Sequence, residues 1–77
     1  MKKVKIYSTS SCPYCHMAKD FLRQNKIAFE DTNIEEDTEA GQEMMRISGQ
    51  YGVPVIDIDG SIVVGFDKAK LKSLLNL

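Results

Sequence analysis

The amino-acid sequence predicts an α/β domain in which three helices flank a four-stranded mixed sheet, with the element order β-α-β-α-β-β-α. A chain of 77 residues has room for one domain, so we expect residues 1–77 to form a single unit. A strand pattern, an amphipathic helix pattern and a second strand pattern follow one another, which predicts two parallel strands joined by a helix. Further along, two apolar runs flank Asp59-Gly60 and predict an antiparallel hairpin. Together these units give the mixed sheet.

The first strand and the first helix are expected on either side of a polar turn at residues 9–11. Residues 4–8 form the strand, with Val4 and Ile6 on one face. After the turn, apolar residues recur at the spacing of one helix face. This apolar stripe comprises Tyr14, Met17, Ala18, Phe21 and Leu22. The opposite, solvent-facing side is filled by His16, Lys19, Asp20, Arg23 and Gln24. Asn25 and Lys26 suit the end of the helix.

A second strand and a second helix follow. Residues 27–32 predict the strand, although the pattern there is weaker. Asp37 is the expected N-cap of the helix, because a carboxylate can accept from the free N–H groups of a first turn. The inner face of this helix consists of Ala40, Met44 and Ile47. Gly49 is expected to end it.

The C-terminal part is predicted to hold the hairpin and the last helix. Residues 55–58 and 61–64 form the two strands, joined by the two-residue turn. Asp67 is a suitable N-cap for a helix whose inner face is Leu71, Leu74 and Leu75. This completes three helices and four strands.

Composition and charge exclude several classes of function. The formal net charge of −1 argues against nucleic acid as the main partner, since neutralising phosphates requires an excess of Lys and Arg. No apolar run has the length of a signal peptide core or of a membrane span, so we expect a cytoplasmic protein without a membrane partner. Stable structural disulfides are rare in the cytosol. Two cysteines at Cys-x-x-Cys spacing therefore indicate redox or metal chemistry.

Cys12-Pro13-Tyr14-Cys15 lies where the first strand gives way to the first helix. Cys12 falls at the helix N-terminus, where free N–H groups and the helix dipole favour an anion, so its thiolate is stabilised. Pro13 fits the first helical position, where its missing N–H removes no hydrogen bond. Cys15 lies one turn along in line with Ala18 and should be partly covered. The spacing brings the two sulfurs close enough to bridge.

These positions imply two catalytic roles. Cys12 attacks a substrate disulfide and forms a mixed disulfide, and Cys15 then attacks the Cys12 sulfur, releasing reduced substrate and closing an internal disulfide. We expect Cys12 to be the more reactive thiol of the two.

A metal site is the main alternative for the two cysteines. A structural zinc site normally needs four ligands, whereas the chain offers two cysteines and His16, which the helix periodicity points away from the cysteine-bearing side. We therefore expect no metal within one chain. A metal or iron–sulfur centre shared by two chains through Cys12 stays open, as does a binding module without turnover. His16 itself is expected at the surface.

The chain resembles the dithiol glutaredoxins at several motifs beyond Cys-Pro-Tyr-Cys. Lys5-Ile6-Tyr7-Ser8 resembles the first strand of that family. Ser48-Gly49-Gln50 followed by Val53-Pro54 resembles the stretch before its third strand, and Gly65-Phe66-Asp67 resembles its loop before the last helix. The resemblance covers nearly the whole chain and implies a minimal thioredoxin fold.

The resemblance also implies roles for individual residues. Pro54 matches a cis-proline that faces the cysteines, and Val53 matches the residue whose backbone pairs with glutathione or substrate. Gln50 and Asp67 match positions that contact the two ends of glutathione, and Asp67 could also cap the last helix. Tyr14 matches an aromatic side chain beside the active site, and Gly65 and Phe66 complete the expected substrate-binding loop. No bound cofactor is implied; glutathione and disulfide-containing proteins are the expected partners.

Four departures from the family pattern open a second interpretation. Thr9 and Gly52 stand where many members carry lysine and threonine, and a glycine pair is reduced to Val64-Gly65. Phe66 stands where the family often has a small or polar residue. Gly65-Phe66 also resembles the glutaredoxin-like electron donors of ribonucleotide reductase, which thioredoxin reductase recycles. Two hypotheses result: a glutathione-dependent disulfide reductase, and a redoxin recycled by thioredoxin reductase.

Overall fold

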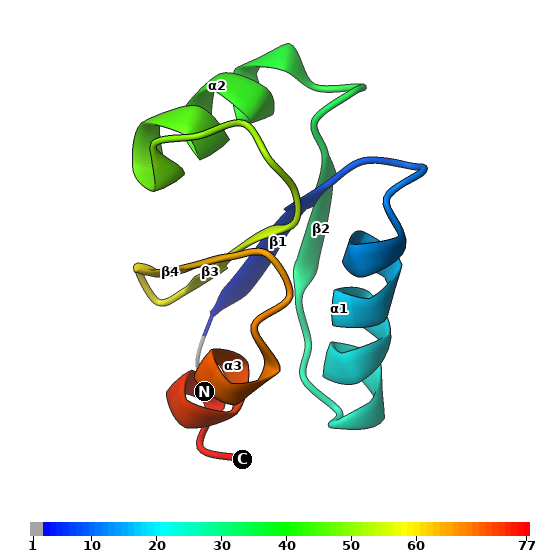
Figure 1. The fold of residues 1–77 in the computed structure, drawn as a ribbon, viewed down its shortest axis with the longest axis vertical. Helices are drawn as coiled ribbons and strands as arrows, with labels where there is room; N and C mark the ends of the chain where they lie inside the picture. Colours follow the sequence, from blue (N-terminus) through cyan, green and yellow to red (C-terminus); the bar gives the residue numbers. More distant parts are fainter. Residues whose placement is uncertain (1–2) are drawn as a thin grey trace.

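The computed structural model describes residues 3–77, which form the predicted sequence of strands and helices (Figure 1). The elements are β1 (Val4–Ser8), α1 (Pro13–Gln24), β2 (Glu30–Asn33), α2 (Thr38–Ser48), β3 (Val55–Ile58), β4 (Ser61–Val64) and α3 (Lys68–Leu75). Within the described residues, no helix combines the length and the apolar character that a membrane span requires.

The four strands form one mixed sheet in the order β2-β1-β3-β4. β1 and β2 are parallel, while β3 pairs antiparallel with both β1 and β4. This confirms the predicted α/β fold with a parallel pair and a hairpin. The prediction that β2 begins at Ile27 is wrong, because β2 begins at Glu30. The Ile27 N–H donates to the Leu22 carbonyl at 2.9 Å, so it serves the C-terminal end of α1 instead of a strand ladder.

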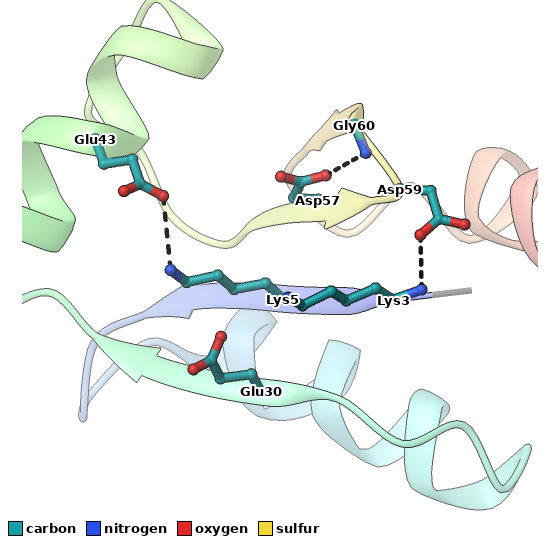
Figure 2. A pocket seen from close by; sticks show the side chains of 7 residues that line it. All are labelled: Lys3, Lys5, Glu30, Glu43, Asp57, Asp59 and Gly60. Carbon is teal, nitrogen blue, oxygen red and sulfur yellow. Dashed lines mark hydrogen bonds and ion pairs between the residues drawn. The ribbon is translucent and has the colours of Figure 1, made fainter. Parts of the chain in front are cut away.

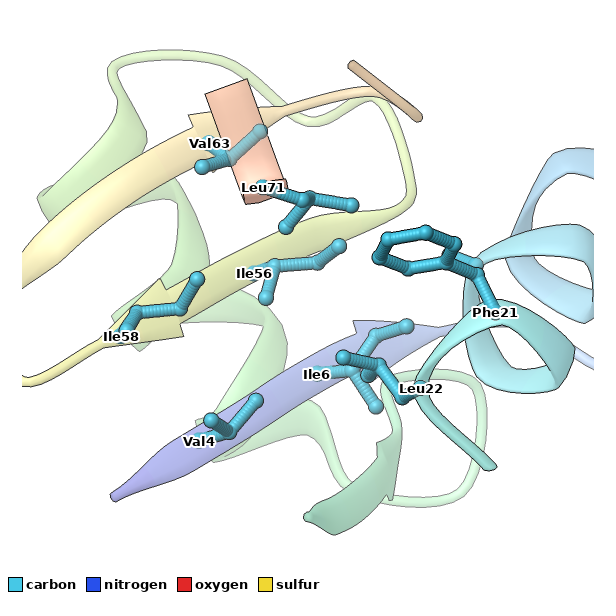
Figure 3. Close-up of a cluster of buried hydrophobic side chains, with 9 residues drawn as sticks. Val4, Ile6, Phe21, Leu22, Ile56, Ile58, Val63 and Leu71 are labelled. Carbon is cyan, nitrogen blue, oxygen red and sulfur yellow. The ribbon is translucent and has the colours of Figure 1, made fainter. Parts of the chain in front are cut away.

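Alternating side chains divide the core between the two faces of the sheet. The larger cluster lies under α1 and α3, and Figure 3 shows its aliphatic side chains converging on Phe21 and Leu22. Its strand residues are Val4, Ile6, Ile56, Ile58 and Val63, and Leu71 comes from α3. The smaller cluster lies under α2 and consists of Tyr7, Ala40, Met44 and Val55. We call these two sides the α1 face and the α2 face.

Helix α1 buries a side that is rotated slightly from the predicted stripe. Ala18, Phe21 and Leu22 are buried as expected. Tyr14 and Met17, however, are 62% and 48% exposed, so their prediction as core residues is wrong. The side against the sheet instead includes Cys15, Ala18, Lys19 and Leu22, which also follow helical spacing. Lys19 was expected in solvent, but it is buried.

The other helices begin and end as the sequence predicts. The Asp37 carboxylate accepts from the Ala40 N–H at 3.1 Å, and α2 ends at Gly49, which has a left-handed φ of 74°. Asp67 caps α3 by accepting from the Lys70 N–H at 3.1 Å. In the hairpin, Asp59 and Gly60 have φ values of 51° and 92°. Positive φ at both central residues is what a two-residue turn matched to the strand twist requires.

Candidate active site

Cys12 is the N-cap of α1. Its backbone is extended, with φ −88° and ψ 112°, and Pro13 occupies the first helical position. The Cys15 N–H donates to the Cys12 sulfur across 3.3 Å. A sulfur that receives a helix N-terminal N–H is placed where negative charge is favoured. The Cys12 residue is half-buried, so it is more accessible than the buried Cys15.

Cys15 lies one turn further along and is completely buried. Burial raises the pKa of its thiol to about 11, and its hydrogen bond with Cys12 acts in the same direction. A hydrogen bond from the Thr9 backbone and the positive charge of Lys19 oppose this increase. Both cysteines are free thiols. The two sulfurs therefore differ: Cys12 is accessible, and Cys15 is covered and held mainly as the neutral thiol.

The loop before β3 lies against Cys12. The peptide bond between Val53 and Pro54 is cis, as the family resemblance implied, and Pro54 is buried. The Cys12 thiol lies 3.8 Å from the Val53 carbonyl oxygen, to which it donates. The Gly65 N–H donates to the Pro54 carbonyl at 2.7 Å. The fold thus brings Cys12, Val53, Pro54 and Gly65 into one connected group.

Gln50 is near this group in the chain but turns its side chain back onto its own loop. The Gln50 Nε2 donates to the Ser48 hydroxyl at 3.2 Å and to the Gly52 carbonyl at 3.0 Å, while its Oε1 accepts from the Gly52 N–H. A Cβ on Gly52 would lie 2.6 Å from Gln50 Oε1. The missing side chain at position 52 therefore permits this closed arrangement, and the Gln50 amide has its hydrogen bonds within the loop.

The remaining candidate residues surround the site less directly. The Phe66 ring packs edge-on against Phe21, with 5.9 Å between the ring centres, and so belongs to the core margin. Asp67 is exposed and caps α3, and Tyr14 projects from the first turn of α1. Tyr51, which sequence reasoning did not select, is 64% exposed just before the Val53 loop.

Sequence reasoning also missed the polar group beneath Cys15. The Lys19 Nζ lies 3.0 Å from Asp31 Oδ2, and the Ser8 hydroxyl donates to Asp31 Oδ1 at 2.9 Å. The available signal was the spacing: Lys19 stands four residues after Cys15 and three before Leu22, within the face that packs on the sheet. Asp31 pairs with Ile6, an inward-pointing position of β1.

His16 and the surface hollow offer no competing site. His16 is exposed, as expected, and its Nε2 lies 3.1 Å from the Ser10 carbonyl oxygen. Among residues 3–77, no three His, Cys, Asp or Glu side chains form a group that could hold a metal. A hollow of about 290 Å³ lies on the α2 face, lined by lysines and carboxylates and by no cysteine (Figure 2). In it Lys5 lies 3.6 Å from Glu43.

This geometry suits thiol–disulfide exchange. An accessible sulfur at a helix N-terminus can attack, and a second sulfur one turn away can resolve the product. The Val53 carbonyl lies against the Cys12 sulfur. The site therefore offers a sulfur that could act as a nucleophile, a second thiol that could resolve the product, and a neighbouring backbone edge.

Comparisons with known proteins agree with this chemistry. The family model for glutaredoxin matches residues 4–63. An uncharacterized glutaredoxin-like 8.6 kDa protein of the Clostridium pasteurianum rubredoxin operon is 47% identical, covering 94% of this chain and 96% of its own. Glutaredoxin 3 of Escherichia coli is 37% identical, with coverages of 87% and 81%. The glutaredoxin-like protein NrdH of Lactococcus lactis is 34% identical, with coverages of 92% and 97%.

Solved structures give the same result for the fold. Glutaredoxin from Archaeoglobus fulgidus superposes with a TM-score of 0.89 at 33% identity, over all of this chain and 89% of that one. NrdH-redoxin from Escherichia coli, a glutaredoxin-like protein with a thioredoxin-like activity profile, gives 0.83 at 26% identity, with coverages of 94% and 93%. With the matched domain, the thioredoxin fold and the Cys12–Cys15 site in agreement, the chain belongs to the glutaredoxin family of thiol redox proteins.

Proposed function

We propose that this protein reduces protein disulfides and glutathione mixed disulfides through Cys12 and Cys15. The observation that carries the proposal is the difference between the two sulfurs: Cys12 is accessible at a helix N-terminus, and Cys15 is fully buried one turn away. We also propose that the reaction takes place in the cytosol, where thiols are kept reduced.

The reaction has two exchange steps. The Cys12 thiolate attacks one sulfur of the substrate disulfide, and the other substrate sulfur leaves with the electron pair. Cys15 then attacks the Cys12 sulfur in the resulting mixed disulfide. The internal disulfide closes, and the second substrate sulfur leaves as a thiolate. Two electrons pass from the dithiol to the substrate.

The first test separates the two cysteines by substitution. Cys15→Ser should accumulate a mixed disulfide on Cys12, visible as a mass increase, because no resolving thiol remains. Cys12→Ser should lose disulfide reduction altogether. A Cys12→Ser variant with wild-type turnover would contradict the mechanism, as would failure of Cys15→Ser to trap any adduct.

Glutathione is the reductant that we propose for recycling the internal disulfide. The half-buried Val53 contacts Cys12 through its carbonyl, and no residue among 3–77 accepts a hydrogen bond from its N–H. A bound peptide such as glutathione could pair with that free backbone group, as the family resemblance implies for this position. The similarity to Escherichia coli glutaredoxin 3 further supports this choice.

A second candidate is a redoxin recycled by thioredoxin reductase. The observation in its favour is the closed Gln50 loop, because an amide hydrogen-bonded to Ser48 and Gly52 must release those partners to bind glutathione. Phe66 is also directed to Phe21 in the core margin. The relatives named NrdH belong to the same family and support this candidate.

The deciding experiment measures reduction of the oxidised protein as free thiols over time. One arm contains glutathione, and the other contains thioredoxin reductase with NADPH. Fast reduction in the first arm supports the glutathione-dependent enzyme, and reduction in the second arm alone supports the redoxin. Gln50→Ala should then raise the glutathione concentration needed for half-maximal rate only if Gln50 binds glutathione. Gln42→Ala, an exposed glutamine on α2, is the matched control.

A further inference from the structure

Lys19 is a charged side chain that the fold buries beside the resolving cysteine. It lies four residues after Cys15 on α1, a spacing that puts two side chains on the same helix face with Cβ atoms about 6 Å apart. Its side chain is only 11% exposed, although lysine is rarely buried without a partner. Ala18 and Leu22, on either side of it on the same face, are fully buried.

The Lys19 ammonium is fixed by a carboxylate from β2. Its Nζ lies 3.0 Å from Asp31 Oδ2, and the Ser8 hydroxyl donates to the other oxygen at 2.9 Å. Ser8 ends β1 and directly precedes Thr9, whose backbone hydrogen-bonds to the Cys15 thiol. These contacts therefore connect Cys15, through α1 and the end of β1, to the Lys19–Asp31 pair.

The groups around Cys15 act on its ionisation in both directions. Burial and the neighbouring Cys12 raise the pKa of Cys15, whereas the Thr9 backbone hydrogen bond and then the positive charge of Lys19 lower it. Asp31, whose side chain is 41% exposed, forms an ion pair with the ammonium at 3.0 Å. A charge acts more strongly in a covered site than across water. Arg23, one turn further along α1, is 61% exposed and pairs with Asp20, so it does not share this position.

We propose that Lys19 is a positioning residue for the second step of disulfide reduction, in which its buried ammonium, fixed by Asp31, favours the Cys15 thiolate. This rests on the proposed dithiol function. In that step Cys15 gives its proton to solvent, and its thiolate forms a bond to the Cys12 sulfur. The bond between Cys12 and the substrate sulfur breaks, and the substrate leaves as a thiolate with the electron pair.

The test uses the full-length reduced protein and dithionitrobenzoate, an aromatic disulfide that releases a coloured thiolate. Attack by Cys12 releases the first equivalent, and attack by Cys15 on the mixed disulfide releases the second. The rate of the second release is followed by stopped flow from about pH 6 to about pH 10. The variants are Lys19→Met, Lys19→Arg and Arg23→Met, the last being a matched loss of charge on the same helix.

Lys19→Met should slow the second release about threefold at neutral pH and move its pH profile upward, with the first release unchanged. A tenfold loss of thiolate lowers the rate only about threefold, because the more basic thiolate is the stronger nucleophile. Lys19→Arg should keep the wild-type rate and profile, since it restores the charge. Arg23→Met should match the wild type.

The outcomes separate this inference from the function on which it rests. Absence of a second release in the wild type contradicts the dithiol function and the role of Lys19 together. A second release whose rate and pH profile are the same in Lys19→Met overturns the role of Lys19 alone. If circular dichroism shows that Lys19→Met does not fold, Lys19→Gln decides, because it removes the charge and keeps a polar side chain that can still bond Asp31. Lys19→Gln should slow the second release as Lys19→Met would, and an unchanged second release overturns the inference.

Discussion

Each face of the sheet carries a lysine, a carboxylate and a hydroxyl in contact, and the two groups have different neighbours. On the α1 face, Lys19 pairs with Asp31, which also accepts from Ser8. On the α2 face, Glu43 accepts from the buried Tyr7 hydroxyl and lies 3.6 Å from Lys5. Lys19 of the first group lies on the same face of α1 as Cys15. The second group joins α2 to β1.

The chemistry of each polar cluster depends on the groups that lie next to it. The Lys19 ammonium acts on the pKa of a thiol that must ionise during the proposed reaction. The Tyr7 phenol is kept neutral, because burial and Glu43 raise its pKa far above its usual value. A neutral buried phenol that donates a hydrogen bond to a carboxylate links the helix to the strand and stabilises the fold. We therefore expect the α1-face cluster to affect redox rate and the α2-face cluster to affect stability.

The largest effect on stability should come from substitutions that leave a cavity in the core. Such substitutions on the two faces should differ in their effect on Cys15. Leu22 and Met44 are both completely buried, under α1 and α2 respectively. Replacing either by alanine should lower the free energy of unfolding by about 2–5 kcal/mol, measured by urea denaturation. Leu22 shares a helix face with Cys15, so only Leu22→Ala should also speed reaction of Cys15 with a disulfide reagent below the transition. Equal acceleration by Met44→Ala would contradict the separation of the two faces.

The local signals in the sequence predicted most of this architecture. Asp37, Asp67 and Asp59-Gly60 act through their nearest neighbours, so their caps and turn could be located before any tertiary contact was known. The Cys12 position followed from the same kind of signal, because a helix N-terminus is a local feature.

Features that depend on distant partners could not be predicted in this way. The predicted apolar stripe leaves Lys19 in solvent, although its spacing from Cys15 and Leu22 fits the buried face; the carboxylate that pairs with it there, Asp31, lies on β2. β2 begins later than predicted because the Ile27 N–H donates to the Leu22 carbonyl of α1. The closed loop at Gln50 depends on the backbone of Gly52. In each case a hydrogen bond outside the local pattern decided the result.

The next effect concerns Cys15 on the α1 face. A thiol whose pKa is about 11 has about 300-fold less thiolate at pH 7 than an ordinary cysteine near 8.5, and its higher nucleophilicity reduces the rate difference to about twentyfold. In Cys12→Ser the effect of Cys12 on this pKa is lost but burial, its largest cause, remains. Reaction of Cys15 with dithionitrobenzoate at neutral pH should therefore be several-fold slower than in the same variant unfolded in urea. Comparable rates in the folded and unfolded protein would contradict the burial and charge assigned to Cys15.

A smaller effect is expected from Tyr7 on the α2 face. Tyr7→Phe should lower the free energy of unfolding by about 1 kcal/mol at pH 7, because the bond to Glu43 is lost. The folded state raises the pKa of Tyr7, so above about pH 10 the unfolded chain loses a proton that the native protein keeps. Wild-type stability should therefore fall as the pH rises above about 10, and the gap to Tyr7→Phe should narrow. The second release from dithionitrobenzoate should be unchanged in this variant.

The smallest effect should come from Lys5, which makes the partly exposed ion pair of the α2 face. The Lys5 and Glu43 side chains are 28% and 42% exposed, so water and salt screen their attraction. Lys5→Met should lower the free energy of unfolding by a few tenths of a kcal/mol, and 1 M salt should remove the difference from wild type. The pKa of Glu43 is lowered most by its hydrogen bond from Tyr7 and next by the charge of Lys5. The stabilisation that Lys5 contributes is therefore present above the usual glutamate pKa, and it is lost as falling pH protonates Glu43. Urea denaturation at neutral and acidic pH, with and without salt, measures this. A loss of unfolding free energy above 1 kcal/mol that persists in 1 M salt would contradict the screened ion pair. Any change in the rate of the second thiolate release would contradict the separation of the two faces.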